Sequence, residues 1–413
     1  MRPARLARWW AAVPVAALLL YAVVLRTPLV VVSPLLPDIR ADFGLNAAQA
    51  GLFTSVPVLC FGLLTPVASG LLRLVGINHA ALYGLAGIII GSVVRSTGGL
   101  GGAFAGTVII GAAIAIGNLA VPMLIGRQFR DRAALLTAAY SATTNVGVAA
   151  ATALAAPMAL WGDWRWSAAV GGVGFGSLAL AVWLWVYPPG VRGARASIQH
   201  RAGLDAPVGR VHAKDAIKVD RSPLLRWRVT WLLATAFCGH TFAYYVITAW
   251  LPTMLIETQE MSIPGAGFAS SLFQAGGILG PVAVAVTVGA LRWPVLRIVT
   301  CVCATWLLMP IGMLAAPVAW PVWSLIAGVG QGAFFTALFM IIIQRARDVD
   351  ENRRLTAVVQ TAGYCVAATG PAAMGWLNEI SGSWNLVLGA VATALMIMTV
   401  ASMSTVLNTS EPP

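Results

Sequence analysis

The stretch AVVLRTPLVVVSPLLPDI, residues 22–39, places one arginine inside an otherwise apolar run. About fifteen mostly apolar residues precede Arg26, beginning at Ala11, and the nearest acidic residue along the chain is Asp38. An apolar run of this length predicts a helix that spans a membrane. A guanidinium cannot release its proton, and at the centre of a bilayer it costs on the order of 3 kcal/mol. The stretch therefore predicts a membrane helix with one buried charge that needs a partner.

Composition extends this interpretation to the whole chain. Of its 413 residues, 59% are hydrophobic and 10% are charged, and the mean hydropathy is +0.83, whereas soluble domains carry about 25% charged residues. We expect an all-α membrane protein with twelve transmembrane helices. The apolar runs that predict them are Ala11–Ser33, Ala50–Leu72, Ala80–Arg95, Gly101–Ile125, Ala133–Ala156, Trp166–Val186, Val229–Met254, Gly265–Ala290, Pro294–Ala316, Val322–Ile343, Leu355–Trp376 and Trp384–Val406.

One long polar stretch separates the sixth run from the seventh and predicts a cytoplasmic linker between two halves. The expected organisation is a six-helix half at 1–187, a linker at 188–228 and a second six-helix half at 229–413. The linker and the other segments on the same side hold 22 of the 26 Lys and Arg residues; three (Arg40, Arg95 and Arg165) fall on the opposite side. The positive-inside rule then places both termini in the cytoplasm. The net charge of +12 is expected to face anionic lipid rather than nucleic acid.

The five cysteines fall in apolar runs and lack metal-ligand spacing. Cys301 and Cys303 are too close together for such a site and have no histidine partner. We expect free, buried cysteines, no disulfide framework, no metal and no cofactor. The full set is Cys60, Cys238, Cys301, Cys303 and Cys365.

Short motifs recur between the two halves at offsets close to 217 residues. Ala50-Gly51-Leu52 is matched by Ala266-Gly267-Phe268, and Leu136-Thr137-Ala138 by Leu355-Thr356-Ala357. The other matches are Gly70-Leu-Leu-Arg73 with Gly289-Ala-Leu-Arg292, and Arg130-Asp131 with Arg347-Asp348. Agreement in order and spacing predicts a parallel repeat about an axis along the membrane normal, the arrangement of major facilitator transporters.

Several stretches resemble the cyanate permease and 2-nitroimidazole transporter family, a branch of the major facilitator superfamily. They are LRTPLVVVSPLLPDIRADFGL from Leu25, AGLFTSVPVLCFGLLTPVA from Ala50, GAAIAIGNLAVPMLIGRQFRDRAALLTAAYSATTNVG from Gly111, GVGQGAFFTALFMIIIQRARD from Gly328 and RLTAVVQTAGYCVAATGP from Arg354. The resemblance implies two pseudo-symmetric six-helix halves around a cavity and a small, planar, electron-rich substrate. The superfamily's Gly-x-x-x-Asp-Arg-x-Gly loop is degenerate here, since alignment on Gly76 puts Arg73 where the acid would stand.

Arg26 has two interpretations. It could reach the outer surface or pair with backbone carbonyls, but the twelve residues to Asp38 correspond to about 18 Å of helix, which is far for ordinary pairing. Intramembrane charges are functional by default, so we expect the counter-charge to be the cargo, a small anion or a molecule with a strongly polar acceptor.

Other polar side chains are expected near the middle of the membrane. Some or all could simply form hydrogen bonds between helices. The resemblance places spans one, four, seven and ten around the cavity, so Arg26, His240, Tyr244 and Gln331 are the leading substrate-binding candidates. The remaining candidates are Asn118, Tyr140, Asn145, Gln274 and Gln360.

No Asp or Glu falls in the middle of a predicted span, and only His240 has side-chain chemistry suited to carrying a proton there. This favours facilitated diffusion or proton symport over drug–proton antiport, although a lone histidine in a membrane is more often a hydrogen-bonding partner.

We expect a monomeric, multi-pass secondary transporter of a bacterial plasma membrane that carries a small polar or anionic solute by alternating access. Efflux of a drug or other xenobiotic is the alternative. A membrane enzyme would need a nucleophile–base pair or metal cluster that the sequence does not supply, and a receptor or lipid-handling protein would need a lateral apolar opening.

Overall fold

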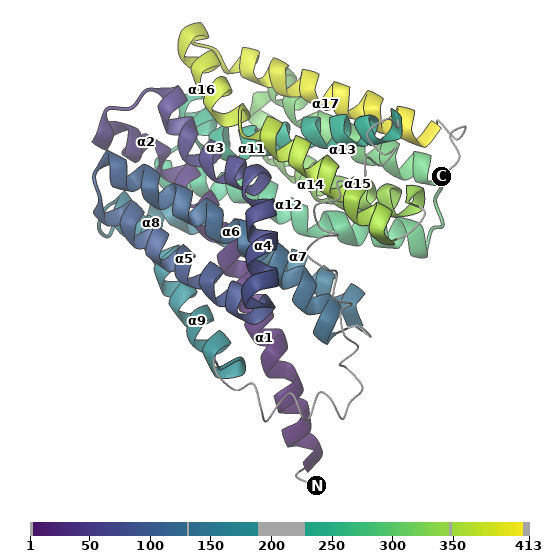
Figure 1. Cartoon of the computed structure of the whole chain (residues 1–413). Helices are drawn as coiled ribbons and strands as arrows, with labels where there is room; N and C mark the ends of the chain where they lie inside the picture. Colours follow the sequence, from purple (N-terminus) through teal and green to yellow (C-terminus); the bar gives the residue numbers. More distant parts are fainter. Residues whose placement is uncertain (1–2, 130–131, 189–227, 347–348, 408–413) are drawn as a thin grey trace.

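The computed structural model describes residues 3–129, 132–188, 228–346 and 349–407, and every element within these ranges is helical (Figure 1). The first half contains α1 (Pro3–Val30), α2 (Val32–Phe43), α3 (Ala47–Leu63), α4 (Thr65–Val75), α5 (Ile77–Thr97), α6 (Leu100–Gln128), α7 (Ala133–Ala159), α8 (Trp164–Ala169), the π-helical turn η2 (Val170–Gly174) and α9 (Phe175–Val186). The second half contains α11 (Arg228–Gln259), α12 (Ile263–Gly289), α13 (Val295–Ala315), η4 (Pro317–Ala319), α14 (Trp320–Arg345), α15 (Val349–Ala367), α16 (Gly370–Ser381) and α17 (Trp384–Leu407). Residues 189–227 of the expected linker and the repeated Arg-Asp pairs at 130–131 and 347–348 lie outside the described residues.

Proline interrupts the first two predicted spans. α1 and α2 meet at Val31, between Pro28 and Pro34, and a proline cannot donate the backbone hydrogen bond that a continuous helix needs. α3 and α4 meet at Leu64, with Pro66 in the first turn of α4, and their axes differ by 57°. The prolines in these two spans predict local breaks at Pro28, Pro34, Pro57 and Pro66. The structure confirms the breaks except at Pro57, which lies inside α3.

Nine helical segments of the described chain are long and apolar enough to cross a membrane, or ten if the bent pair α3/α4 counts as one span. The helix α7 is not among them because Ser, Thr, Tyr and Asn side chains in its first half lower its hydropathy. The pair α15/α16 is also not among these membrane-spanning segments, and the charged run DENRR lies in the first turns of α15. The count of twelve spans therefore stays a prediction.

The two halves meet at one end of the molecule and diverge toward the chain ends (Figure 1). Across this interface α3 packs against α16 and α15, and α7 packs against α12. The helices α2, α3 and α16 lie together at the closed end, whereas the N-terminus of α1 and the C-terminus of α17 lie far apart (Figure 1).

At the repeated Ala-Gly motifs, a helix of one half packs closely against a helix of the other half. A Cβ atom added to Gly51 on α3 would lie 2.6 Å from the Pro371 carbonyl oxygen at the start of α16. One added to Gly267 on α12 would lie 3.1 Å from the Thr152 carbonyl oxygen on α7. Glycine is needed at both positions because the facing backbones leave little or no room for a side chain. The internal repeat thus has a structural purpose in the interface between the halves.

Two hydrogen bonds join the halves at the closed end. The backbone N–H of Ala47, in the first turn of α3, donates to Glu379 Oε2 on α16 (3.2 Å). In return the backbone N–H of Ala372, in the first turn of α16, donates to Ser55 Oγ on α3 (3.3 Å). Each helix therefore satisfies an N-terminal N–H group of the other, which a helix cannot satisfy within itself.

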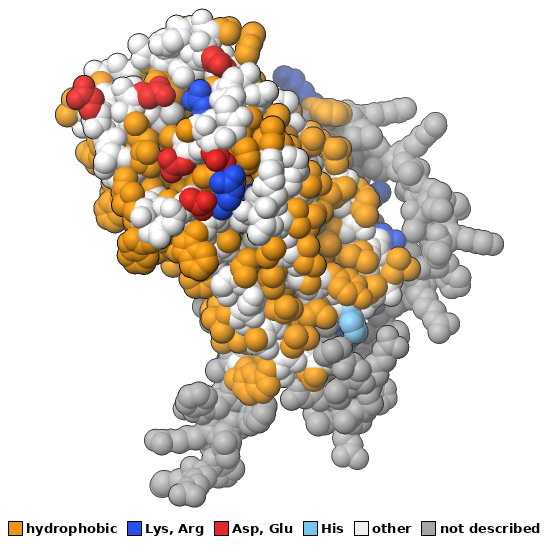
Figure 2. Space-filling model, turned by 90° about the vertical axis from the view of Figure 1, so that its left-hand side faces the viewer, with side chains coloured by type: hydrophobic (Ala, Val, Ile, Leu, Met, Phe, Trp, Pro, Cys, Tyr) orange, Lys and Arg blue, Asp and Glu red, His pale blue; other side chains and the backbone are white. Residues whose placement is uncertain are grey.

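The flank of the molecule is apolar, and the acidic side chains on the face shown gather at the closed end (Figure 2). Large hydrophobic side chains such as Leu63, Val67 and Trp185 are more than half exposed, which suits contact with lipid. The cysteines are free, as expected, and Cys60 and Cys303 are buried. Against the prediction, Cys238 and Cys365 are only half-buried and Cys301 is exposed, on the face of α13 opposite its buried residues.

Candidate functional site

Arg26 lies in the penultimate turn of α1 and faces the other half of the molecule. Its Nη1 donates to the hydroxyl of Tyr245 on α11 (3.1 Å). The ion pairs of the described residues join Arg165 to Asp42 and Asp163 at the closed end, and no described carboxylate pairs with Arg26. The guanidinium therefore keeps its charge between the two halves without a counter-ion in the described chain.

Tyrosine side chains surround this charge. Tyr140, Tyr244, Tyr245 and Tyr364 come from three helices, α7, α11 and α15, and all interact electrostatically with Arg26. The rings of Tyr244 and Tyr245 meet edge to face at 5.1 Å. A phenol is a neutral hydrogen-bonding group, so these side chains can orient the guanidinium without neutralising it.

His240 is buried and already has a partner within the second half. Its Nδ1 accepts a hydrogen bond from Trp306 Nε1 on α13 (3.0 Å). Its ring stacks on Phe334 with centroids 4.5 Å apart, and lies parallel to Tyr244 at 6.4 Å. An accepting Nδ1 carries no proton, so this geometry describes a neutral imidazole with its hydrogen on Nε2. His240 thus belongs to a cluster of aromatic side chains that also contains Trp306, Phe334 and Tyr244.

Gln274 on α12 is held by two side chains of α11. Its Oε1 accepts from the Tyr244 hydroxyl (3.4 Å), and its Nε2 donates to Thr248 Oγ1 (3.1 Å). The expected candidates Tyr244 and Gln274 therefore form one polar chain next to the Arg26 group.

Asn145 and Gln331 meet the same glycine from opposite halves. Asn145 Nδ2 on α7 donates to the Gly277 carbonyl on α12 (3.3 Å). The side-chain amide of Gln331 on α14 occupies the space where a Gly277 side chain would stand. These two candidates line the contact between the halves, and Gln331 is buried there.

The structure connects Asn118 and Gln360 less directly to Arg26 and the tyrosines around it. Both side chains are half-buried, and neither has a hydrogen bond within the described residues. Asn118 follows Gly117, which packs against Tyr21 and Leu25 on α1. Gln360 lies one helical turn before Tyr364, so it occupies the same face of α15.

The candidates predicted from the sequence did not include Tyr245 and Tyr364, although both interact with Arg26. The sequence contains a signal for each of them: Tyr245 directly follows the candidate Tyr244, and Tyr364 lies four residues after the candidate Gln360. It also placed Arg95 in an outside segment, whereas Arg95 is 2% exposed and lies in the last turn of α5. That helix begins three residues earlier in the structure than expected and ends two residues later, so Arg95 is not its last residue.

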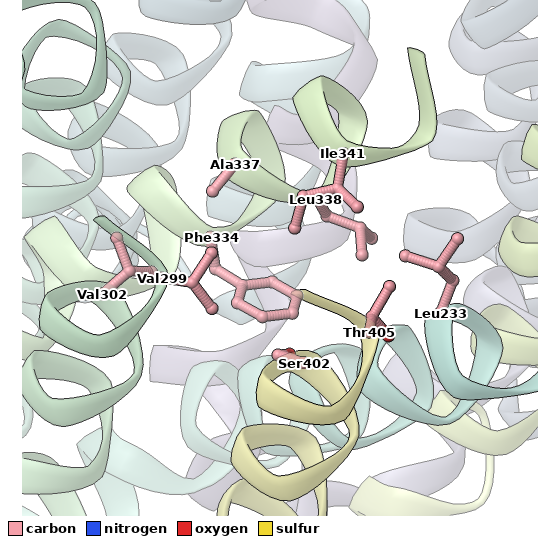
Figure 3. A pocket seen from close by; sticks show the side chains of 9 residues that line it. All are labelled: Leu233, Val299, Val302, Phe334, Ala337, Leu338, Ile341, Ser402 and Thr405. Carbon is pink, nitrogen blue, oxygen red and sulfur yellow. The ribbon is translucent and has the colours of Figure 1, made fainter. Parts of the chain in front are cut away.

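Two cavities lie away from the Arg26 group. One of about 10 Å³ lies in the second half between α11, α13, α14 and α17, with an apolar lining except for Ser402 and Thr405 (Figure 3). Those two hydroxyls donate to carbonyls of their own helix, so this cavity offers no polar group to a ligand. A second, of about 290 Å³, lies at the closed end beside Asp38 and Asp163.

Comparison with known proteins agrees with this architecture. The sequence model of the Major Facilitator Superfamily matches residues 18–364. The chain belongs to the Major Facilitator Superfamily. It is therefore a multi-pass membrane transporter with an all-helical fold, and the expected family resemblance is confirmed.

Among similar proteins, the 2-nitroimidazole transporter of Escherichia coli (strain K12) is 31% identical, over 94% of this chain and 93% of that protein. The cyanate transport protein CynX of the same organism is 23% identical, over 89% and 90% of the two chains. Among solved structures, a D-xylose–proton symporter superposes with a TM-score of 0.72 at 13% identity, covering 96% of this chain and 97% of its own. The nucleoside transporter NupG superposes with a TM-score of 0.71 at 10% identity, covering 95% and 99%. At these identities the solved structures establish the fold alone.

Proposed function

We propose that this transporter carries a small anion, or a small molecule with a strongly polar acceptor, and that Arg26 binds it. The observation that carries the proposal is the guanidinium between the two halves with no described carboxylate partner. A carboxylate-like, nitro or cyanate group would accept its remaining forked donors. The names of the two relatives support the same class, because cyanate and 2-nitroimidazole are small, planar and electron-rich.

The site is shared between the halves, which suits alternating access. Arg26 belongs to the first half and its partner Tyr245 to the second. A cargo that accepts hydrogen bonds from Arg26 and contacts the α11 side chains would change the contact between the halves. Binding can shift a conformational equilibrium only through such a difference in interaction between states.

The direction of opening follows from the expected orientation. With the basic segments in the cytoplasm of a bacterial cell, the closed end held by α3 and α16 is the outer end. The described conformation then faces the cytoplasm, and both termini lie inside.

The coupling that we favour is facilitated diffusion or symport with a proton. Transport by drug–proton antiport usually depends on a buried carboxylate, and none pairs with Arg26 in the described chain. The tyrosines, the Gln274 amide and the charge of Arg26 favour a small polar cargo over a hydrophobic drug, the alternative left open by the sequence.

The test is uptake of radiolabelled cyanate and 2-nitroimidazole by proteoliposomes that contain the full chain. We expect saturable flux for at least one of them. Arg26→Ala should weaken apparent affinity by about a hundredfold, the value of a strong charged hydrogen bond, and Arg26→Lys should retain part of it because the charge remains but the fork is lost.

Arg165→Ala is the matched control, because Arg165 is a partly exposed arginine in an ion pair at the closed end. We expect it to transport like the unmodified protein. Normal transport by a correctly folded Arg26→Ala protein would refute the assignment of the cargo to Arg26.

A further inference from the structure

A second arginine, Arg95, is buried in the first half and binds only backbone carbonyls among the described residues. Its Nη1 donates to the Pro28 carbonyl on α1 (2.6 Å) and its Nη2 to the Ala168 carbonyl on α8 (3.1 Å). Its side chain is 2% exposed, so both bonds are shielded from water. Charge-assisted hydrogen bonds of this kind are about twice as strong as neutral ones.

Both carbonyls lie where a helix is irregular. At the end of α1, Val31 N–H still donates to the Thr27 carbonyl (3.1 Å), and the next carbonyl, that of Pro28, receives Arg95 instead. Ala168 lies two residues before the π-helical turn η2. The Pro28 carbonyl at the end of α1 lacks its regular helical partner, and the negative end of a helix dipole attracts a cation.

The helix that carries Arg95 is itself held firmly. A Cβ atom added to Gly106 on α6 would lie 2.7 Å from Arg95 Cα, so α5 and α6 are in backbone contact at this level. On the same helix Ser92 lies against Gly172 of the π-helical turn. Arg95 therefore connects the broken end of α1 to a tightly packed part of the first half.

Packing alone does not explain an arginine at this position. Its Nε–H is buried and has no hydrogen-bond acceptor within the described residues, and an unsatisfied buried donor is unfavourable. A methionine of similar length would fill the space without that cost. The two carbonyl bonds are what the guanidinium supplies and an apolar side chain cannot.

We propose that Arg95 is a positioning residue for Arg26. It fixes the last turn of α1 two residues after Arg26, against α5 and the π-helical turn, and so holds the Arg26 guanidinium at the level of Tyr245. The effect on cargo binding rests on the proposed function of Arg26, whereas the placement of α1 does not.

The first experiment measures that placement without a cargo. In the full chain with its native cysteines replaced by alanine, Arg26→Cys and Tyr245→Cys are cross-linked in membranes by bis-methanethiosulfonate reagents of graded length. To this background are added Arg95→Met, which has no donor, Arg95→Gln, which has one neutral donor group, and Arg95→Lys, which keeps the charge. Arg165→Met is the matched control.

We expect the control and Arg95→Lys to cross-link best with the same reagent as the parent. Arg95→Gln should lower that yield by about tenfold, and Arg95→Met should lower it further, because it loses both charged hydrogen bonds. If Arg95→Met does not reach the membrane, Arg95→Gln decides the matter. Unchanged yield and preferred length in whichever of these two variants is folded would overturn the proposal.

The second experiment separates positioning from a purely structural role. In proteoliposomes with cyanate as the probe, we expect Arg95→Gln to raise KM by about tenfold, with a smaller change in Vmax per folded protein. A purely structural role would reduce the folded amount and leave KM unchanged.

The two proposals fail in different ways. If Arg26→Ala transports normally, the proposed function fails and the cross-linking result still decides the placement of α1. If Arg26→Ala loses binding while Arg95→Gln changes neither cross-linking nor KM, only the positioning role fails.

Discussion

Arg26 and Arg95 are both arginines within helices of the first half, and their surroundings differ in a way that separates their roles. Arg95 uses both terminal nitrogens on backbone carbonyls, while Arg26 interacts with the phenols of Tyr245 and Tyr364 of the other half. The donors of Arg26 that remain can bind a cargo. Those of Arg95 are occupied or buried.

At the same scale, His240 provides a test of proton coupling. Its Nδ1 accepts from Trp306 and its ring lies between aromatic neighbours. We expect His240→Asn, whose amide oxygen can replace Nδ1 as acceptor, to keep transport and its pH dependence. His240→Leu should destabilise the fold by about 1–3 kcal/mol, because it leaves the buried Trp306 N–H without an acceptor.

The measurements are thermal unfolding in detergent and uptake of the probe at pH 6 and pH 8. Trp306→Phe is the matched control, since it removes the donor of the same hydrogen bond. If folded His240→Asn protein loses the pH dependence of uptake that the unmodified protein shows, His240 carries a proton and the partner role is wrong.

At the scale of elements, the breaks in the first spans and the close approaches of glycines determine how the halves meet. α3 reaches α16 only because Gly51 has no side chain, and its repeat partner Gly267 allows α12 to reach α7. These contacts belong to the closed end, so they exist only while that end is shut.

We therefore expect Gly51→Ala to disfavour the conformation that is closed at this end. The added Cβ would lie 2.6 Å from the Pro371 carbonyl oxygen, which is closer than atoms pack in protein interiors. A membrane-impermeant maleimide should then label Ser55→Cys more rapidly from outside, and Vmax should fall by about tenfold if closure is disfavoured by roughly 1.4 kcal/mol.

Gly70→Ala provides the control for helix propensity, because nothing lies within 4 Å of its added Cβ. It should leave labelling and transport unchanged, or stabilise α4 slightly. Equal labelling rates in the Gly51→Ala and Gly70→Ala backgrounds would show that the α3–α16 contact does not control access.

At the scale of the whole molecule, the distribution of basic residues predicts orientation. Most of the 26 Lys and Arg residues fall in segments expected inside, whereas acidic side chains gather at the closed end (Figure 2). We expect fusions of green fluorescent protein to the C-terminus to fluoresce and fusions of alkaline phosphatase there to be inactive. Both results are those expected when the C-terminus lies in the cytoplasm.

The complementary fusion tests the opposite face. Alkaline phosphatase inserted after Gln259, in the short connection between α11 and α12 at the closed end, should be active in the periplasm. Phosphatase activity at the C-terminus together with inactivity after Gln259 would invert the orientation and, with it, the side to which the described conformation opens.

The scaffold of this protein follows from features that are local in its sequence. Long apolar runs must become membrane helices, because a backbone in lipid has to satisfy its own hydrogen bonds. The spacing of the repeated motifs then indicated two related halves, and the prolines near Arg26 indicated a broken first span. Each of these conclusions depends on local chemistry or on regular spacing, which a sequence displays directly.

The polar groups that meet are set by how the helices pack, which the structure shows. Arg26 donates to Tyr245, 219 positions away along the chain, and His240 accepts from Trp306. Arg95 donates to carbonyls of two other helices and does not lie in an outside segment. A helix displays side chains around its whole circumference, so its sequence does not specify which face meets a given neighbour. That choice is made by packing between helices that are distant in the chain.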